Sequence, residues 1–216
     1  MPGLNLEGIR IIDISPSVSD NLAVFPGDVQ YQRKVSMDMQ LGDHLTLSSI
    51  TTTLHLGAHA DAPNHYAVNG SGIHSRNLNL YMGPCTVIDF DCSRGMQINL
   101  EELPEELPTP RILFKTGSFP DPNIWTNEFS FFSAEFVTKF AHRGGVLLGI
   151  DTPSIDSADS KDLPAHSAVS QNDLAVLEGL VLGHVEPGNC NLIALPLPLV
   201  GADASPVRAV LLPYQS

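Results

Sequence analysis

The sequence has little cysteine, and its cysteines form no recognisable framework. They are Cys85, Cys92 and Cys190. An odd number of cysteines without metal-ligand pairing predicts no disulfide framework. Cys85 and Cys190 lie in apolar runs, so we expect small core residues there rather than nucleophiles.

Positive charge is also scarce. The chain has 11 Lys and Arg residues against 24 Asp and Glu residues, for a net charge of −13. Because the electrostatic force between such a chain and a phosphate backbone is repulsive, we expect no nucleic-acid partner. The charge otherwise favours solubility and identifies no partner.

Long apolar runs are missing as well. No stretch approaches the roughly eighteen apolar residues of a membrane-spanning helix, so we expect no membrane partner. The first eight residues lack the basic region and apolar stretch that are typical of a signal peptide. The sequence therefore predicts a cytoplasmic location.

What remains is an ordinary globular composition, with 43% hydrophobic and 16% charged residues. A chain of 216 residues is long enough for one sizeable core and too short for two comfortable ones. We therefore expect residues 1–216 to form a single domain. Its 17 glycines and 17 prolines are spread along the chain and predict many short elements.

The pattern of apolar residues predicts an α/β fold that is rich in strand. A helix is expected after Ser133, a typical N-cap, with Phe136, Val137, Phe140 and Ala141 on one face and Gly144 at its end. A short, continuously apolar strand follows, which favours a mixed central sheet with at least one covering helix. Strands are predicted over residues 9–14, 45–54, 86–90, 112–114, 146–151, 191–195 and 207–212.

The most informative stretch is residues 55–65, HLGAHADAPNH, with three histidines and one aspartate. Imidazole and carboxylate groups suit zinc, manganese and iron. In an extended strand the Cα atoms of His55 and His59 would be roughly 13 Å apart, too far for ligands of one ion.

A helix would turn Asp61 to another face, and Pro63 argues against one. We therefore expect no regular element here but a bend at Gly57, which accepts a positive φ and lets His55, His59 and Asp61 converge. The alternative is a polar loop with incidental histidines.

A second cluster lies further along the chain. His166 follows Pro164, and Glu178 falls inside the apolar run of residues 174–182. A buried, unpaired carboxylate would cost several kcal/mol, so Glu178 is expected to meet a metal or an opposite charge. Two alternatives stay open: Glu178 faces water at the end of an element, or it pairs with a buried arginine such as Arg208.

These residues together resemble the metal-dependent cyclase-like hydrolases, whose signature reads H-x-G-T-H-x-D-x-P-x-H. The signature appears at residues 55–65 with Ala58 in place of Thr. Within the family, the chain is most similar to the bacterial kynurenine formamidase (arylformamidase) branch. The resemblance extends to residues 13–15, 26–28, 149–154, 159–161, 165–166, 177–180, 193–197 and 203–209.

The resemblance implies a set of roles and a fold. The metal ligands would be His55, His59, Asp61, His166 and Glu178, with Asp61 bridging two ions, and His65 would be the catalytic acid/base residue. The fold would be a single swivelling β/β/α domain with a mixed sheet, assembled as a homodimer. The implied cofactor is zinc, two ions per chain, with manganese in some relatives.

The implied reaction is hydrolysis of a linear amide, N-formyl-L-kynurenine to L-kynurenine and formate, in tryptophan catabolism. Zinc suits it because it lowers the pKa of water and polarises a carbonyl. Phe25 stands where the branch carries a Trp that lines the substrate pocket, so we expect Phe25 to bind substrate. Ser167 replaces a second His after His166.

Two other functions are compatible with this sequence. The first is a hydrolase of the same fold that acts on another amide or a lactam, like isatin hydrolase. The second is a non-catalytic protein that binds a metal or a ligand. The presence of His65 beside a full ligand set argues against the second, because a structural zinc site needs no extra base.

Overall fold

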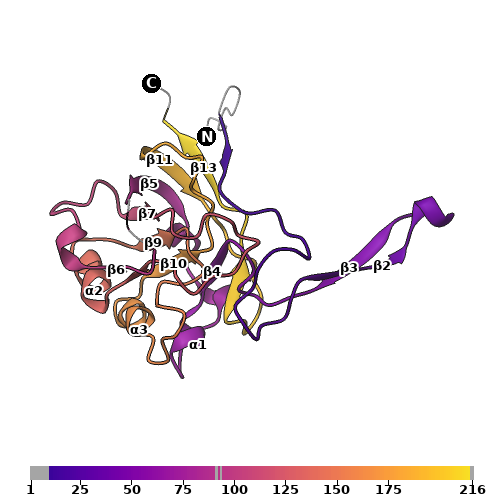
Figure 1. The fold of residues 1–216 in the computed structure, drawn as a ribbon, viewed down its shortest axis with the longest axis horizontal. Coiled ribbons are helices and arrows are strands. Elements are labelled where there is room, and N and C mark those ends of the chain that lie inside the picture. Colours follow the sequence, from indigo (N-terminus) through magenta and orange to yellow (C-terminus); the bar gives the residue numbers. More distant parts are fainter. Residues whose placement is uncertain (1–9, 91, 93, 215–216) are drawn as a thin grey trace.

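The computed structural model describes residues 10–90, 92 and 94–214, and its centre is a nine-stranded sheet (Figure 1). The four middle strands β5, β7, β9 and β10 run parallel to one another, and the remaining pairs are antiparallel. The predicted mixed sheet is therefore confirmed. In spatial order the strands are β1 (Ile12–Asp13), β13 (Val210–Pro213), β11 (Gly188–Ile193), β5 (Met82–Asp89), β7 (Arg111–Lys115), β9 (Leu147–Ile150), β10 (Ala175–Glu178), β4 (His59–Asp61) and β12 (Ala204–Pro206).

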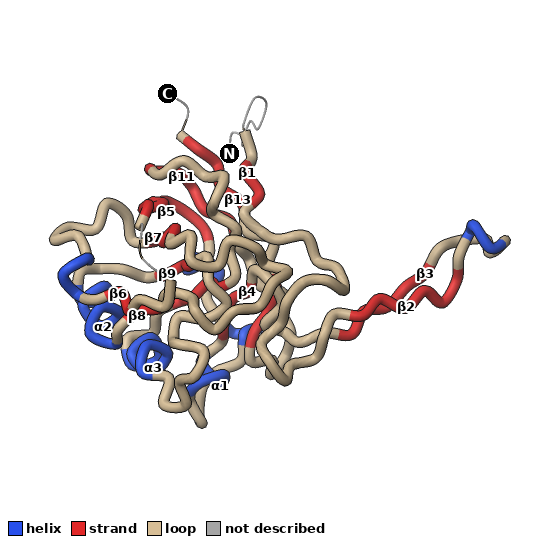
Figure 2. Tube along the Cα trace, in the orientation of Figure 1, coloured by secondary structure: helices blue, strands red, loops and turns tan. Residues whose placement is uncertain are grey.

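The parallel strands are buried on both faces, which explains their continuous apolar composition. In β7, Ile112 and Phe114 face one hydrophobic cluster and Leu113 faces the other. The first cluster lies under two helices that contact each other, α2 (Ala134–His142) and α3 (Pro164–Gln171). Figure 2 shows these helices together on one side of the body.

Helix α2 forms where the sequence predicts it. The Ser133 side chain accepts a hydrogen bond from the backbone N–H of Phe136, as an N-cap does. Phe136, Val137 and Phe140 are fully buried against the sheet, while Ala141 packs at the edge of the same cluster. Gly144 follows the helix with φ of 89°, a left-handed conformation that glycine adopts without strain.

The predicted strands are present, with shifted ends. The strand expected at residues 9–14 appears as β1, with Ile9 outside the described residues, and the one expected at 45–54 as β3 (Leu47–Thr51). Several elements were not predicted. They are the strands β4, β10 and β12, a strand at residues 32–37, the parallel pair β6 (Gln97–Ile98) and β8 (Phe131–Phe132), and the helices α1 (Pro63–Tyr66) and α3.

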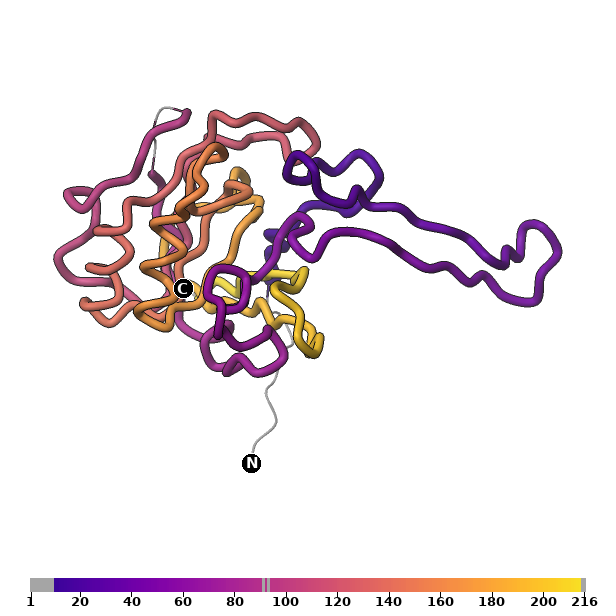
Figure 3. The backbone as a smooth tube through the Cα atoms, turned by 90° about the horizontal axis from the view of Figure 1, so that it is seen from below, coloured from indigo at the N-terminus to yellow at the C-terminus, as the bar shows by residue number. Residues whose placement is uncertain are grey.

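Strand β2 (Gln32–Met37) pairs with β3 to form a long arm that leaves the body of the molecule (Figure 3). Both strands are exposed along almost their whole length. A 3₁₀ turn, Met39–Leu41, lies between these strands, and three more occur at Ile73–Ser75, Leu78–Leu80 and Leu100–Glu102. No helix within the described parts of the chain has the length and apolar character needed to cross a bilayer.

Cysteines behave as the sequence predicts. Cys85 and Cys190 are buried and lie directly opposite each other on β5 and β11. Neither forms a disulfide.

Candidate metal centre and active site

Strand pairing sets the core of the site. His59 and Asp61 are alternate residues of β4, so their side chains project from the same face of the sheet. Glu178, the last residue of β10, is directly opposite His59 in the antiparallel register, which puts both side chains on that face. Nε2 of His59 lies 3.1 Å from Oε2 of Glu178 and 3.5 Å from Oδ1 of Asp61.

A bend at Gly57 brings His55 to the same cluster. Gly57 has φ of 56°, and Nδ1 of His55 lies 3.2 Å from Oδ1 of Asp61. The predicted bend is therefore confirmed. The prediction that the motif contains no regular element is wrong in part, because residues 59–61 form a strand between β10 and β12, pairings that sequence spacing does not reveal. The expectation that Pro63 argues against a helix is wrong in part as well, because Pro63 is the first residue of the short helix α1, a position that proline tolerates.

His166 reaches the cluster from the first turn of α3. Its Nε2 lies 3.2 Å from Oδ2 of Asp61 and 3.4 Å from Oε1 of Glu178. Asp156 fixes the ring from behind: its carboxylate accepts hydrogen bonds from Nδ1 of His166 at 2.7 Å and from the backbone N–H groups of Ala165 and His166. Asp156 thus satisfies the start of the helix and orients the imidazole.

The donor set fits a metal ion. Nδ1 of His59 donates to the carbonyl of Gly57 at 2.8 Å, and Nδ1 of His166 donates to Asp156, so in the neutral rings each Nε2 carries a lone pair. Both lone pairs face the carboxylates of Asp61 and Glu178, an arrangement that requires a cation or a second proton between them.

One oxygen of the cluster lies close to two imidazoles without forming a hydrogen bond. Oδ1 of Asp61 is buried, and Nδ1 of His55 at 3.2 Å and Nε2 of His59 at 3.5 Å are its neighbours, but among the described residues it finds no hydrogen-bond partner. Ligand atoms of His59, Asp61 and Glu178 lie within 4.8 Å of one another, and so do those of His55, Asp61 and His65. Buried polar atoms without partners are rare, and a metal between imidazoles and carboxylates would satisfy this one.

The carboxylates and imidazoles of the cluster shift one another's pKa values. Burial would raise the pKa of Asp61, but the neighbouring rings of His166 and His55 outweigh it and hold that pKa well below its usual value. Burial would lower the pKa of His55, but the adjacent carboxylate of Asp61 raises it to about 9. The site therefore attracts positive charge strongly.

His65 and Asp203 lie at the rim of the cluster. His65 is on α1, with 32% of its side chain exposed, and its Nδ1 is 3.8 Å from Oδ2 of Asp203. The same oxygen accepts a hydrogen bond from Nε2 of His55 at 3.0 Å. Partial burial lowers the pKa of His65 below its usual value, which favours the neutral ring.

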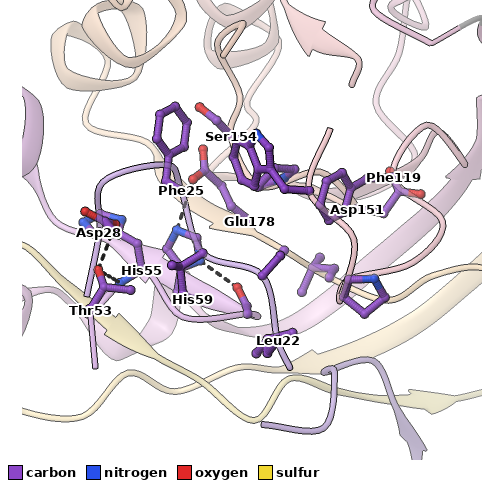
Figure 4. A pocket seen from close by; sticks show the side chains of 18 of the residues that line it. Leu22, Phe25, Asp28, Thr53, His55, His59, Phe119, Asp151, Ser154 and Glu178 are labelled. Atoms are coloured by element: carbon purple, nitrogen blue, oxygen red, sulfur yellow. Dashed lines mark hydrogen bonds and ion pairs between the residues drawn. The ribbon is translucent and has the colours of Figure 1, made fainter. Parts of the chain in front are cut away.

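Residues of the cluster line a cavity of about 520 Å³ (Figure 4). His55, His59 and Glu178 lie together in this view, with Phe25 beside them and Phe119 and Asp151 further along the wall. The cavity is lined largely by apolar side chains, including Leu22, Phe25, Phe119, Trp125, Leu163, Leu180, Val181 and Leu182. Its size and lining suit a small aromatic molecule.

All the predicted site residues therefore lie in one place, namely His55, His59, Asp61, His65, His166, Glu178 and Phe25. The two alternatives for Glu178 are wrong: it is buried among the histidines, and Arg208 pairs instead with Asp13 at 2.6 Å. Ser167 faces away from the cavity, toward a shallow groove beside α2.

Sequence reasoning missed Asp156, Asp203, Asp151 and Trp125. Asp203 was part of a matching segment, and Asp151 ends a predicted strand, but nothing local marks either as part of a site. Their positions depend on contacts between distant segments.

Comparison with known proteins gives the class. Residues 12–157 match the family described as "Putative cyclase", which is more than half of the chain, and the protein belongs to this family. Kynurenine formamidase of Bordetella avium (strain 197N) is 43% identical over 204 residues, which are 94% of this chain and 97% of that protein. The resemblance found in the sequence is confirmed.

Solved structures agree with the fold. The structure of a potential metal-dependent hydrolase with cyclase activity has a TM-score of 0.83 at 25% identity and covers 97% of this chain and 100% of its own. Isatin hydrolase A from Labrenzia aggregata, bound to benzyl benzoate, has a TM-score of 0.77 at 18% identity over 99% and 97% of the chains, which shows the shared fold alone. The first neighbour and the His/Asp/Glu cluster together indicate a metal ion in this site.

Proposed function

We propose that this protein is a metal-dependent amidohydrolase that converts N-formyl-L-kynurenine and water to L-kynurenine and formate, a step of tryptophan catabolism. The observation that carries the proposal is the 43% identity with a kynurenine formamidase along nearly the whole length of both chains. The cavity lined by Phe25, Phe119 and Trp125 as well as by residues of the His/Asp/Glu cluster fits such a substrate.

The cofactor that we propose is zinc, with up to two ions per chain and manganese as the alternative. His55, His59, Asp61, His166 and Glu178 would hold it, with Asp61 between the two groups of ligands. When bound, zinc supplies Lewis acidity, which lowers the pKa of water and polarises a carbonyl oxygen.

Proton transfer is the role that we propose for His65. A formamide can release its aniline nitrogen only if that nitrogen gains a proton, and a neutral imidazole can take one from water and deliver it. Because His65 is partly exposed at the rim, its ring can reach both the attacking water and the leaving nitrogen. The carboxylate of Asp203, 3.8 Å from Nδ1 of His65, favours the protonated imidazole that forms between these two proton transfers.

Phe25 is proposed as part of the wall against which the aryl group of the substrate packs. It lies on the cavity and is 38% exposed, so its ring is available for contact with a ligand. Edge and offset contacts between aromatic rings are favourable by about 0.5–1.5 kcal/mol.

We further propose that the protein acts as a homodimer. The arm formed by β2 and β3 leaves the body of the molecule (Figure 3). It carries exposed apolar side chains, namely Val35, Met39, Leu41, Leu45, Leu47 and Ile50. A second copy of the chain is the simplest surface to cover them.

Three further expectations remain predictions from the sequence: one domain over residues 1–216, a cytoplasmic location, and no nucleic-acid or membrane partner. The first is supported by the central sheet, in which β1 and β13 from opposite ends of the chain are neighbours.

The test is a direct comparison of N-formylkynurenine with isatin on purified, zinc-loaded protein. We expect N-formylkynurenine to have a kcat/KM at least tenfold above that of isatin, with formate and kynurenine released in equal amounts. Faster turnover of isatin would assign a lactam hydrolase instead. Turnover of neither by metal-loaded protein would favour a non-catalytic binding protein.

A further inference from the structure

The only tryptophan of the chain faces the candidate substrate cavity from a loop, residues 117–129, that no sequence motif marks. The ring of Trp125 meets the ring of Phe25 edge to face, with 4.9 Å between centroids and an interplanar angle of 68°. The backbone N–H of Ala23 donates to the carbonyl of Pro122 at 3.0 Å, which ties this loop to the segment that carries Phe25. Figure 3 shows the two segments side by side.

The indole of Trp125 is held in a fixed orientation. The rings of Phe119 and Phe129 each lie 6.1 Å from it, in edge-to-face geometry. Its Nε1–H donates to the side-chain oxygen of Asn127 at 2.7 Å. Because the N–H is already satisfied within the loop, the ring offers a ligand its apolar surface in a prepared position.

Buried hydrogen bonds fix the two ends of this loop. Asp151 accepts hydrogen bonds from the backbone N–H groups of Thr116 and Gly117 and from the hydroxyl of Thr116, at 2.6 to 3.0 Å. The hydroxyl of Ser118 accepts from the backbone N–H of Ser130 at 2.9 Å, so the two ends of the loop are joined. Asp151 itself follows β9 and is buried.

We propose that Trp125 is a specificity-determining residue that binds the aryl ring of the substrate beside Phe25, on the wall that the two rings form together, and that Asp151 is a positioning residue that holds the loop in place. The proposal rests on the proposed function, and it deepens it by naming the element that selects aryl formamides over alkyl formamides. Of the rings of Phe25, Phe119 and Trp125 that line the cavity, the indole of Trp125 is the largest aromatic surface.

Kinetics of Trp125→Ala test the first part. We expect KM for N-formylkynurenine to rise about tenfold or more, while kcat/KM for N-methylformamide, which has no ring, and the metal content stay within about twofold. The KM of Trp125→Phe for N-formylkynurenine should lie between that of the unaltered protein and that of Trp125→Ala. Ile124→Ala, a neighbour in the same loop that is 66% exposed, is the matched control and should behave as the unaltered protein. An equal loss for both substrates, or no loss, would overturn the proposal.

Fluorescence gives a readout that does not depend on turnover, because Trp125 is the only emitter of its kind in the chain. We expect acetanilide to change the emission of Trp125 and acetamide at the same concentration to leave it unchanged. If N-formylkynurenine is not hydrolysed but acetanilide still changes the emission, the proposed function fails and the aryl site stands. No change at acetanilide concentrations that saturate binding in calorimetry, or no binding in calorimetry, contradicts the aryl site.

Asp151→Asn tests the positioning role. The amide cannot accept all the hydrogen bonds that the carboxylate accepts, so the loop should loosen: we expect red-shifted Trp125 emission and a raised KM ratio between N-formylkynurenine and N-methylformamide, with metal retained. Thr116→Val should act in the same direction, and Thr116→Ser, which keeps the hydroxyl, should not. A lower melting temperature with unchanged emission and KM ratio would show a merely structural role.

Discussion

Oδ2 of Asp156 lies 2.7 Å from Nδ1 of His166, and both groups are buried. The same carboxylate accepts hydrogen bonds from two backbone N–H groups at the start of α3. It therefore fixes at once the tautomer of the imidazole, the angle of its ring and the first turn of the helix that carries it.

This relationship predicts the behaviour of Asp156→Asn. The amide has one accepting oxygen instead of two, so it cannot accept from both Nδ1 of His166 and the backbone N–H of Ala165. The ring of His166 or the start of α3 should therefore shift, and metal affinity should fall about 10- to 100-fold. Titration against a competing chelator measures the change. Asp159→Asn, at an exposed position three residues away, is the control and should bind metal normally. Unchanged affinity in Asp156→Asn would show that Asp156 only caps the helix.

Removal of the metal should abolish hydrolysis and also lower the melting temperature, since an ion that binds the native chain alone stabilises it by mass action. Elemental analysis should find up to two ions per chain. We expect Ala substitution of His59 or Glu178 to reduce the ion content, and His142→Ala, on an exposed position at the end of α2, to leave it unchanged. Full activity after chelation would remove the metal from the mechanism.

His65→Ala should keep its metal and fold but lose roughly 10²-fold or more in kcat, the usual scale of general acid–base catalysis. The structure motivates this expectation because His65 is at the rim, outside the buried group of His59, Asp61 and Glu178. Steady-state kinetics and elemental analysis of the same preparation measure both quantities. If the variant lost metal in proportion to activity, His65 would be a ligand instead.

Phe25→Ala should raise KM for aryl formamides while changing the melting temperature little, because the side chain is already 38% exposed. Phe25→Trp should change the relative rates of aryl formamides and lactams, since a larger ring would approach Trp125. Thermal melts separate the cavity role from a core role. A large fall in melting temperature with unchanged KM would place Phe25 in the core.

Gly179 predicts a sharp effect on stability. Its φ is 64°, and a Cβ there would lie 2.1 Å from the carbonyl oxygen of Gly57, which accepts the hydrogen bond that orients His59. Gly179→Ala should therefore lower the free energy of unfolding by about 2 kcal/mol or more. Gly183→Ala, with no atom near the added Cβ, should change it by less than about 0.5 kcal/mol. Chemical denaturation of both variants compares the two.

The sequence predicts well what is decided locally. Helix α2 is marked by the N-cap Ser133 and by the spacing of Phe136 and Phe140, and the central strands β5, β7 and β9 by their apolar runs. The proposed ligands of the metal centre could be named from the sequence because imidazoles and carboxylates concentrate in two short segments, and because the resemblance to the family covers both segments.

Other features depend on distant pairings and leave no local pattern. Strand β4 has only three residues and exists because β10 and β12 pair with it on either side. Trp125 sits among polar residues in a loop, with no periodicity that points it toward a cavity. Asp203 approaches His55 across 148 positions of the chain. Such contacts become visible only when the segments are placed in space.

The proposed ligands of the metal centre come from segments that are far apart in the chain: His59 and Glu178 are separated by 119 positions, and Asp61 and His166 by 105. An ion bound by them would fasten β4 to β10 and α3 as a covalent cross-link does, and it would close a very long loop. Without the ion, β4 and β12, which have three residues each, are held at one end of the sheet mainly by their backbone pairing. Their amide hydrogens should exchange with solvent faster than those of β5, β7 and β9, and zinc should slow that exchange selectively.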